Sequence, residues 1–296
     1  MSLSNDENPW LADVRRARRR WPGWAAAIGA AAFSVAVLMS FKTWGGQLMD
    51  ALAADFRHMP GVWGDAMAVG AVQCAIFGCF LAAAQLAVGV EGRALWRGGR
   101  TGKIAALAWG LAIGAAGYAA TVALADLAGA IAPGPFTGVT WDAVLFGAAL
   151  VAFQSVAEEA FFRGWLQPIL CVAWGPLAGV AVTSALFAGL HIIAGAHGPL
   201  AVANLFLGGL LFGLLALRTG NLFAAAGAHF AWNWTESGLL GLAEQPTPSV
   251  LHFGFAGSPL WNGGADAMNG SLAMSLVLAG LVLGVAVTLR LASRPT

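Results

Sequence analysis

Charged residues are scarce in this sequence. Asp, Glu, Lys and Arg make up 10% of the 296 residues, whereas soluble globular proteins average about 25%. Hydrophobic residues make up 59% of the chain, and the mean hydropathy is +0.74. This composition excludes a soluble globular protein and predicts an all-α fold, a polytopic bundle of membrane helices.

Several chemical signatures are also missing. The three cysteines are Cys74 and Cys79 in an apolar run and Cys171 near a segment end, a spacing that gives neither a disulfide framework nor a metal motif. The HExxH spacing of many zinc proteases is absent. Ser155 has no adjacent base motif, so no serine or cysteine nucleophile is evident. The sequence also has no internal repeat, low-complexity tail or soluble domain.

Apolar windows of about 17–25 residues predict membrane spans. Gly/Pro-rich stretches that are typical of tight turns separate many of them. We count eight predicted spans: Gly23–Phe41, Met67–Val90, Ile104–Ile131, Val144–Phe162, Leu177–Ile193, Leu200–Leu217, Leu222–Leu242 and Leu272–Leu291.

The chain divides into four parts along its length. Residues 1–22 form a basic N-terminal segment, and residues 23–143 hold three spans. Residues 144–242 form a core of four spans that carries the polar motifs described below. Residues 243–296 hold a Pro/Gly-rich loop, expected to be irregular and extramembrane, and the last span.

Lysine and arginine are distributed unevenly between the two sides of the predicted bundle. Five arginines lie between Arg15 and Arg20, and four further cations lie between Arg93 and Lys103. The first apolar stretch is too long for a signal-peptide core and lacks a small-residue cleavage site, so we expect a retained span. The positive-inside rule then places both termini in the cytoplasm. The Ala/Gly/Arg/Trp-rich composition favours a bacterial inner membrane.

Two adjacent carboxylates and an arginine interrupt the fourth span. Intramembrane charges are costly and usually functional. Glu159 and Arg163 stand at i,i+4 on a helix, so they are expected to form an ion pair. Glu158 points about 100° away from that pair, towards the face of Gln154 and Ser155. One carboxylate is therefore predicted to be neutralised in place while its neighbour stays available for chemistry.

Further polar residues occur in two later spans. His191 lies late in the fifth span, and His229 and Asn233 share one helical face in the seventh. A single such residue is usually a hydrogen-bonded contact between helices, but this combination on three spans indicates a common site. Glu236 continues the stripe, and we expect it to face water on the loop side.

These residue types match the requirements of a water-activating hydrolase. A carboxylate in an apolar setting is suited to general-base catalysis, for which Glu158 with His191 is the candidate. His229 and Asn233 offer hydrogen-bond donors for a developing oxyanion. A zinc ion held by Glu158, His191 and His229 is an alternative, because two histidines and a carboxylate form a catalytic zinc set. The placement of Asn233 favours the reaction without a metal cofactor.

The three motifs together resemble those of the CAAX protease and bacteriocin-processing family of intramembrane endopeptidases, also called the Abi family. The resemblance covers roughly Val144 to Leu242. It implies that Glu158 and His191 activate water, that His229 and Asn233 stabilise the oxyanion, and that Glu159 and Arg163 support them. The motifs in this chain are Glu158-Glu159-x-x-x-Arg163, Phe187-x-x-x-His191 and His229-x-x-x-Asn233.

The expected partners are a peptide or protein substrate at the membrane and the lipid bilayer, with no nucleic acid. The substrate could be a prenylated CAAX protein, a bacteriocin precursor or a related protein. A transporter or proton relay is an alternative, although neither a repeat nor paired broken helices support it. A non-catalytic bacteriocin-immunity protein is a third possibility.

The predicted spans also pose a problem of depth. Glu158 and His191 lie in spans that start on opposite sides of the membrane. If the depth of each residue is counted from the start of its own span at 1.5 Å per residue, the two depths differ by roughly 10 Å. For the two residues to share a site, one span must begin or end at a different residue from the one predicted, or one helix must be tilted or broken.

Overall fold

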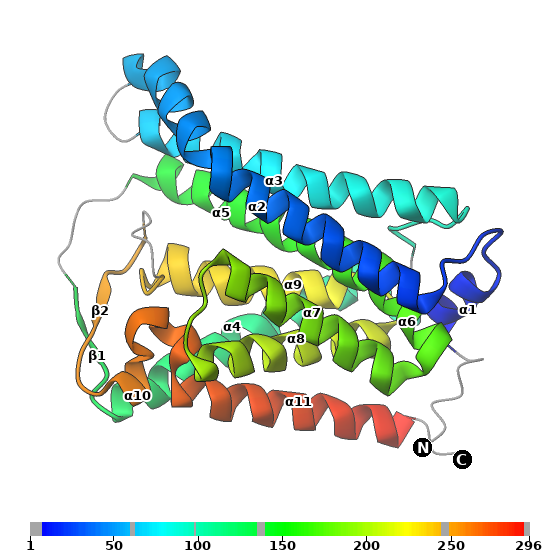
Figure 1. Ribbon diagram of the computed structural model, residues 1–296. Helices are drawn as coiled ribbons and strands as arrows, with labels where there is room; N and C mark the ends of the chain where they lie inside the picture. The colour runs from blue at the N-terminus through cyan, green and yellow to red at the C-terminus, as the bar shows by residue number, and fades with distance from the viewer. Residues whose placement is uncertain (1–7, 60–62, 98, 135–139, 244–248, 293–296) are drawn as a thin grey trace.

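Long, roughly parallel helices dominate the computed structural model (Figure 1), which describes residues 8–59, 63–97, 99–134, 140–243 and 249–292. Seven of the described helices are long and apolar enough to cross a membrane, which confirms the polytopic helical bundle. They comprise α2 (Gly23–Asp55), α3 (Trp63–Val90), α4 (Lys103–Leu127), the continuous α5–η2–α6 helix (Trp141–Trp174), α7 (Pro176–Ala194), α8 (Pro199–Thr219) and α11 (Leu272–Ala292).

The predicted span Leu222–Leu242 is a shorter helix in the structure. It consists of α9 (Phe223–Trp234) and the π-helical segment η3 (Thr235–Leu239). Its start is fixed locally, because α8 ends at Gly220 with φ +71° and the Asn221 side chain accepts a hydrogen bond from the Phe223 amide at 3.0 Å. Eight of the twelve α9 residues are buried and none is exposed, so this helix lies within the bundle, consistent with about eight spans in total.

Small residues allow α4 and α9 to pack closely. A methyl group added at Gly114 would lie 2.2 Å from the carbonyl oxygen of Ala228, and one at Gly110 would lie 2.1 Å from that of Ala224. Such close backbone approach is typical of small-residue interfaces between membrane helices. Because α9 carries His229 and Asn233, this crossing helps to position both side chains.

The predicted end of the fourth span at Phe162 is wrong. The helix continues through the π-helical segment η2 (Ala160–Leu166), all of it buried, into α6 (Gln167–Trp174). Arg163 and its neighbours pack into the core, so the polar motif does not mark a helix end. Such π-helical segments are rare in proteins, and those that occur are often found at functional sites.

The longer helix resolves the problem of depth. Helices α6 and α7 meet at Gly175, which has φ +90°. Glu158 precedes Gly175 by 17 residues and His191 follows it by 16, which places them about 26 Å and about 24 Å from the turn. The two side chains therefore lie at nearly the same depth.

Two other predicted boundaries are also corrected. Helix α2 continues past Phe41 to Asp55, and η1 (Phe56–His58) follows it. The region from Ala243 to Gly270, where residues 244–248 lie outside the described part, is not wholly irregular. It contains β2 (Phe253–Phe255), α10 (Pro259–Asn262) and the 3-10 helix η4 (Gly264–Gly270), and β2 pairs antiparallel with β1 (Ile131–Pro133).

The bundle has two distinct ends (Figure 1). Helix α1 (Pro9–Arg15), the α6–α7 turn and the last turn of α11 lie at one end, while β1, β2 and α10 lie at the other. The first is here called the basic end, because eleven described lysines and arginines lie there, namely Arg15, Arg16, Arg18, Arg19, Arg20, Arg93, Arg97, Arg100, Lys103, Arg218 and Arg290. The other is called the loop end.

Candidate active site

Glu159 is the centre of a buried polar cluster. Its Oε1 accepts a hydrogen bond from Arg163 Nη1 at 2.8 Å and lies 2.9 Å from Nδ1 of His229. Glu159 and Arg163 are both fully buried. The predicted i,i+4 ion pair is therefore present, and the same carboxylate also holds a histidine that lies 70 residues away in the sequence.

Arg163 is held on several sides. Its Nη2 donates to the carbonyl oxygen of Gly209 on α8 at 3.0 Å. The guanidinium group also lies 4.8 Å from the ring centroid of Phe187, with Phe162 and Phe212 at 5.7 and 5.6 Å. Cation–π contacts are strongest where water is excluded, so Arg163 fixes the position of Glu159 within the bundle.

Glu158 faces a different set of groups from Glu159. Its Oε1 accepts from Gln154 Nε2 at 3.1 Å, as expected for a side chain on the face of Gln154. Its Oε2 lies 4.0 Å from Nε2 of His229 and has no hydrogen-bond partner among the described residues. Glu158 is 7% exposed, so it is a buried carboxylate with one oxygen that no described protein group satisfies.

The two histidines are oriented by their neighbours. Nδ1 of His191 lies 2.8 Å from the carbonyl oxygen of Phe187, one turn earlier on α7. A proton on Nδ1 satisfies this carbonyl and leaves Nε2 as the acceptor. The ring of His229 is stacked on Phe212, with 4.8 Å between centroids and 16° between planes. His229 thus has its Nδ1 towards Glu159 and its Nε2 towards Glu158.

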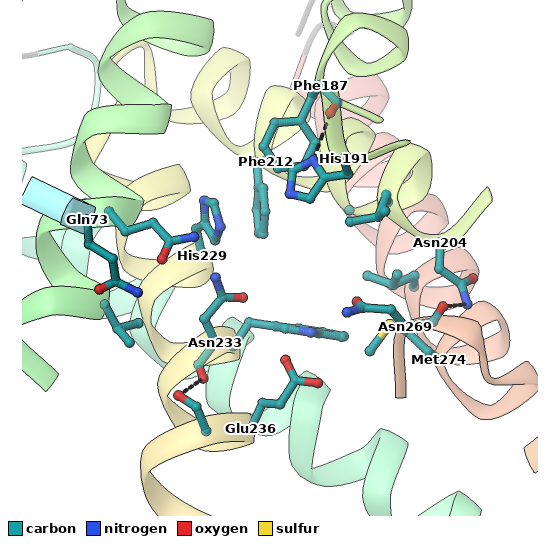
Figure 2. Close-up of a pocket in the computed structure, with 17 residues that line it drawn as sticks. Gln73, Phe187, His191, Asn204, Phe212, His229, Asn233, Glu236, Asn269 and Met274 are labelled. Carbon is teal, nitrogen blue, oxygen red and sulfur yellow. Dashed lines mark hydrogen bonds between the residues drawn. The ribbon is translucent and has the colours of Figure 1, made fainter. Parts of the chain in front are cut away.

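A cavity of about 320 Å³ adjoins this cluster. Figure 2 shows His191, His229 and Asn233 facing the cavity, together with Glu236. Asn233 lines the cavity wall, so its side-chain amide is placed where a ligand can reach it. Other polar residues on its wall are Gln73, Gln154, Asn204, Ser237 and Asn269.

A second cavity of about 170 Å³ lies on the other side of Gln154 and His191. Glu158 lines this cavity, and most of the remaining wall is apolar. Gln154 and His191 line both cavities. They therefore mark a junction where a carboxylate and polar donors meet. The apolar wall consists of Leu38, Phe77, Phe80, Phe162, Leu190 and Ala194.

The structure brings together all the residues that the sequence motifs single out. Glu159 and Arg163 form the buried support, and Glu158, His191, His229 and Asn233 line the two adjoining cavities. Glu236 lies on the cavity wall rather than simply facing water at the loop side. The role of each residue in chemistry remains a prediction.

Sequence reasoning missed two contributors to this site. Phe212 on α8 stacks on His229, and nothing in its apolar surroundings distinguishes it from a core residue. Gln73 on α3 lines the larger cavity. An uncharged polar residue within the apolar run 67–90 could have identified it.

The arrangement of ligands bears on the zinc alternative. Among the described residues, no group of three or more His, Cys, Asp and Glu side chains is arranged to hold a metal ion. Glu158 and His229 approach to 4.0 Å, and Nδ1 of His229 is engaged with Glu159. Whether Glu158, His191 and His229 work with or without a metal therefore stays a prediction.

Comparison with known proteins supports the resemblance seen in the motifs. Residues 140–235 match a family model described as type II CAAX prenyl endopeptidase Rce1-like. No curated protein and no solved structure gave a match. The matched segment contains α5 to α9 and so includes Glu158, His191, His229 and Asn233.

Proposed function

Because residues 140–235 of this chain match the model of the Rce1-like family of type II CAAX prenyl endopeptidases, we propose that the protein is an intramembrane endopeptidase of the glutamate type. Its substrate would be a membrane-associated protein or peptide whose scissile bond enters the junction of the two cavities. The observation that carries this proposal is the convergence of Glu158, His191, His229 and Asn233 there, from three separate helices.

Water activation is assigned to Glu158 and His191. The acceptors assigned to the attacking water are Oε2 of Glu158, which has no hydrogen-bond partner among the described residues, and Nε2 of His191. As the water oxygen attacks the peptide carbonyl carbon, its proton passes to this pair. The same proton is then delivered to the leaving nitrogen when the C–N bond breaks.

Oxyanion stabilisation is assigned to Asn233 and His229. The Asn233 amide has hydrogens to donate, and it lies one turn from His229 on the same face of α9. His229 donates from Nε2 when its ring carries both protons, since Nδ1 faces Glu159. Donors aimed in advance at the developing negative charge often make the largest contribution to acyl-transfer catalysis.

The support around His229 explains the role proposed for Glu159 and Arg163. Glu159 sets the orientation of the His229 ring through Nδ1, and Phe212 restricts it by stacking. Arg163 in turn neutralises Glu159. The family match favours proteolysis over a transporter or an immunity protein.

The proposal is tested with purified protein in lipid vesicles. The probes are fluorogenic peptides ending in Cys-aliphatic-aliphatic-X, supplied in farnesylated and unmodified forms. The Glu158→Gln variant should lose about 10²–10⁴-fold in rate, because an amide cannot take a proton from water. It should keep the elution profile of the wild type in detergent.

The matched control is Asp65→Asn, which makes the same chemical change at an exposed position on α3. This control should retain wild-type activity. Full activity in Glu158→Gln would overturn the assignment of the base. Absence of cleavage of every peptide by the wild type would count against the proposed function.

A further inference from the structure

Glu236 is a carboxylate that the proposed chemistry does not use. It lies on η3, seven residues beyond His229, and its carboxylate points into the larger cavity (Figure 2). The hydroxyl of Tyr118 on α4 lies beside it. Glu236, Asn233 and His229 thus form one continuous stripe along the cavity wall.

The wall of this cavity offers Glu236 no lysine or arginine as a partner. Among the described residues that line it, none is Lys or Arg, and Glu236 is the one carboxylate. Arg163 is fully buried and is paired with Glu159. A carboxylate that is partly withdrawn from water and lacks a lysine or arginine partner can bind a positively charged group from a ligand.

The neighbouring side chains suit such a group. Asn269 and Gln73 bring carboxamides to the same cavity, and Trp232 lines it with an aromatic ring. Carboxamide oxygens accept hydrogen bonds from ammonium or guanidinium groups, and an indole face attracts a cation.

The charge of the surrounding surface has the same sign as Glu236. The cavity lies in the half of the bundle nearest the loop end, where the described acidic residues outnumber Lys42 and Arg57. Such an excess of negative charge favours the approach of cationic ligands. Apart from Glu236 itself, the acidic residues are Asp50, Asp55, Asp65, Asp126, Asp142 and Asp266.

We propose that Glu236 is a specificity determinant that binds a lysine or arginine side chain of the substrate close to the scissile bond. This inference rests on the proposed function. Seven residues of helix separate Glu236 from His229 by about 10 Å, which corresponds to about three residues of extended peptide. The cationic residue is therefore expected within about three positions of the bond that is cut.

The first test uses the wild-type protein in vesicles. Fluorogenic peptides that carry lysine, norleucine or glutamate in turn at each of three positions on either side of the scissile bond are compared. One position should show a preference for lysine over norleucine of about 10- to 100-fold in kcat/KM, the range expected for a hydrogen-bonded charge. Cleavage without any such preference would overturn the inference and leave the proposed function standing. Failure to cleave any peptide would overturn both.

The second test uses variants of Glu236. Glu236→Gln should abolish the lysine preference through a higher KM, with kcat for the norleucine peptide unchanged, because a ground-state contact is removed. Glu236→Lys should invert the preference towards glutamate. Tyr118→Phe is the matched control, because it removes the adjacent hydroxyl and keeps the carboxylate, so the preference should persist. An equal loss for all peptides in Glu236→Gln would indicate a structural role and overturn the inference.

Discussion

Replacing Glu159 by alanine tests the support of the site directly. The change removes the shared acceptor of Arg163 and His229, which lie 2.8 and 2.9 Å from the same oxygen. Both Glu159 and Arg163 are fully buried. The variant therefore leaves a buried cation without its counter-charge and a histidine without its orienting partner.

The magnitude follows from these contacts. Removing one partner of a buried ion pair costs about 3–5 kcal/mol. Arg163 keeps its hydrogen bond to the carbonyl of Gly209 and its contact with the Phe187 ring, so we expect a loss near the lower limit, about 3 kcal/mol. Turnover should also fall, because the His229 ring is no longer held at Nδ1.

The assay is equilibrium unfolding in mixed detergent micelles, followed by tryptophan fluorescence. The adjacent Glu158→Ala is the matched control. Its hydrogen-bond partner is the neutral Gln154 amide, so it should lose about 1 kcal/mol. A double variant, Glu159→Ala with Arg163→Met, should recover stability, since no buried charge is stranded. A Glu159→Ala protein as stable as the wild type would refute the reasoning.

Three further predictions concern packing, topology and metal. Gly114→Leu should prevent folding or activity, because even a methyl group there meets the Ala228 carbonyl at 2.2 Å; Gly78→Leu, where nothing lies within 4 Å of the added Cβ, should be tolerated. In a cysteine-free background, Arg19→Cys should be labelled from the cytoplasm and Leu260→Cys from outside, and labelling of both from one side would contradict the predicted orientation. Exhaustive chelation should leave activity intact; stoichiometric zinc, with activity lost on chelation and restored by zinc, would contradict the metal-free proposal.

Features that depend on local spacing or composition could be predicted from the sequence. The hydropathy pattern predicts a polytopic bundle, and seven described helices meet the criteria for a membrane span. The i,i+4 spacing predicts the Glu159–Arg163 pair, because residues four apart lie on one helical face in any α-helix. The same argument places His229 and Asn233 together. The three motifs, in this order, indicate the family whose model residues 140–235 match.

How separate helices meet could not be predicted from the sequence. No periodicity relates Glu159 to His229, since their contact depends on how α5 and α9 pack. The equal depth of Glu158 and His191 follows from the continuation of α5 through η2 into α6. This continuation was not predicted, because charged residues usually mark the end of a membrane span. The position of Glu236 beside Tyr118 likewise depends on the close crossing of α4 and α9. Spacing along one helix fixes which side chains share a face, but only the packing of helices fixes what that face meets.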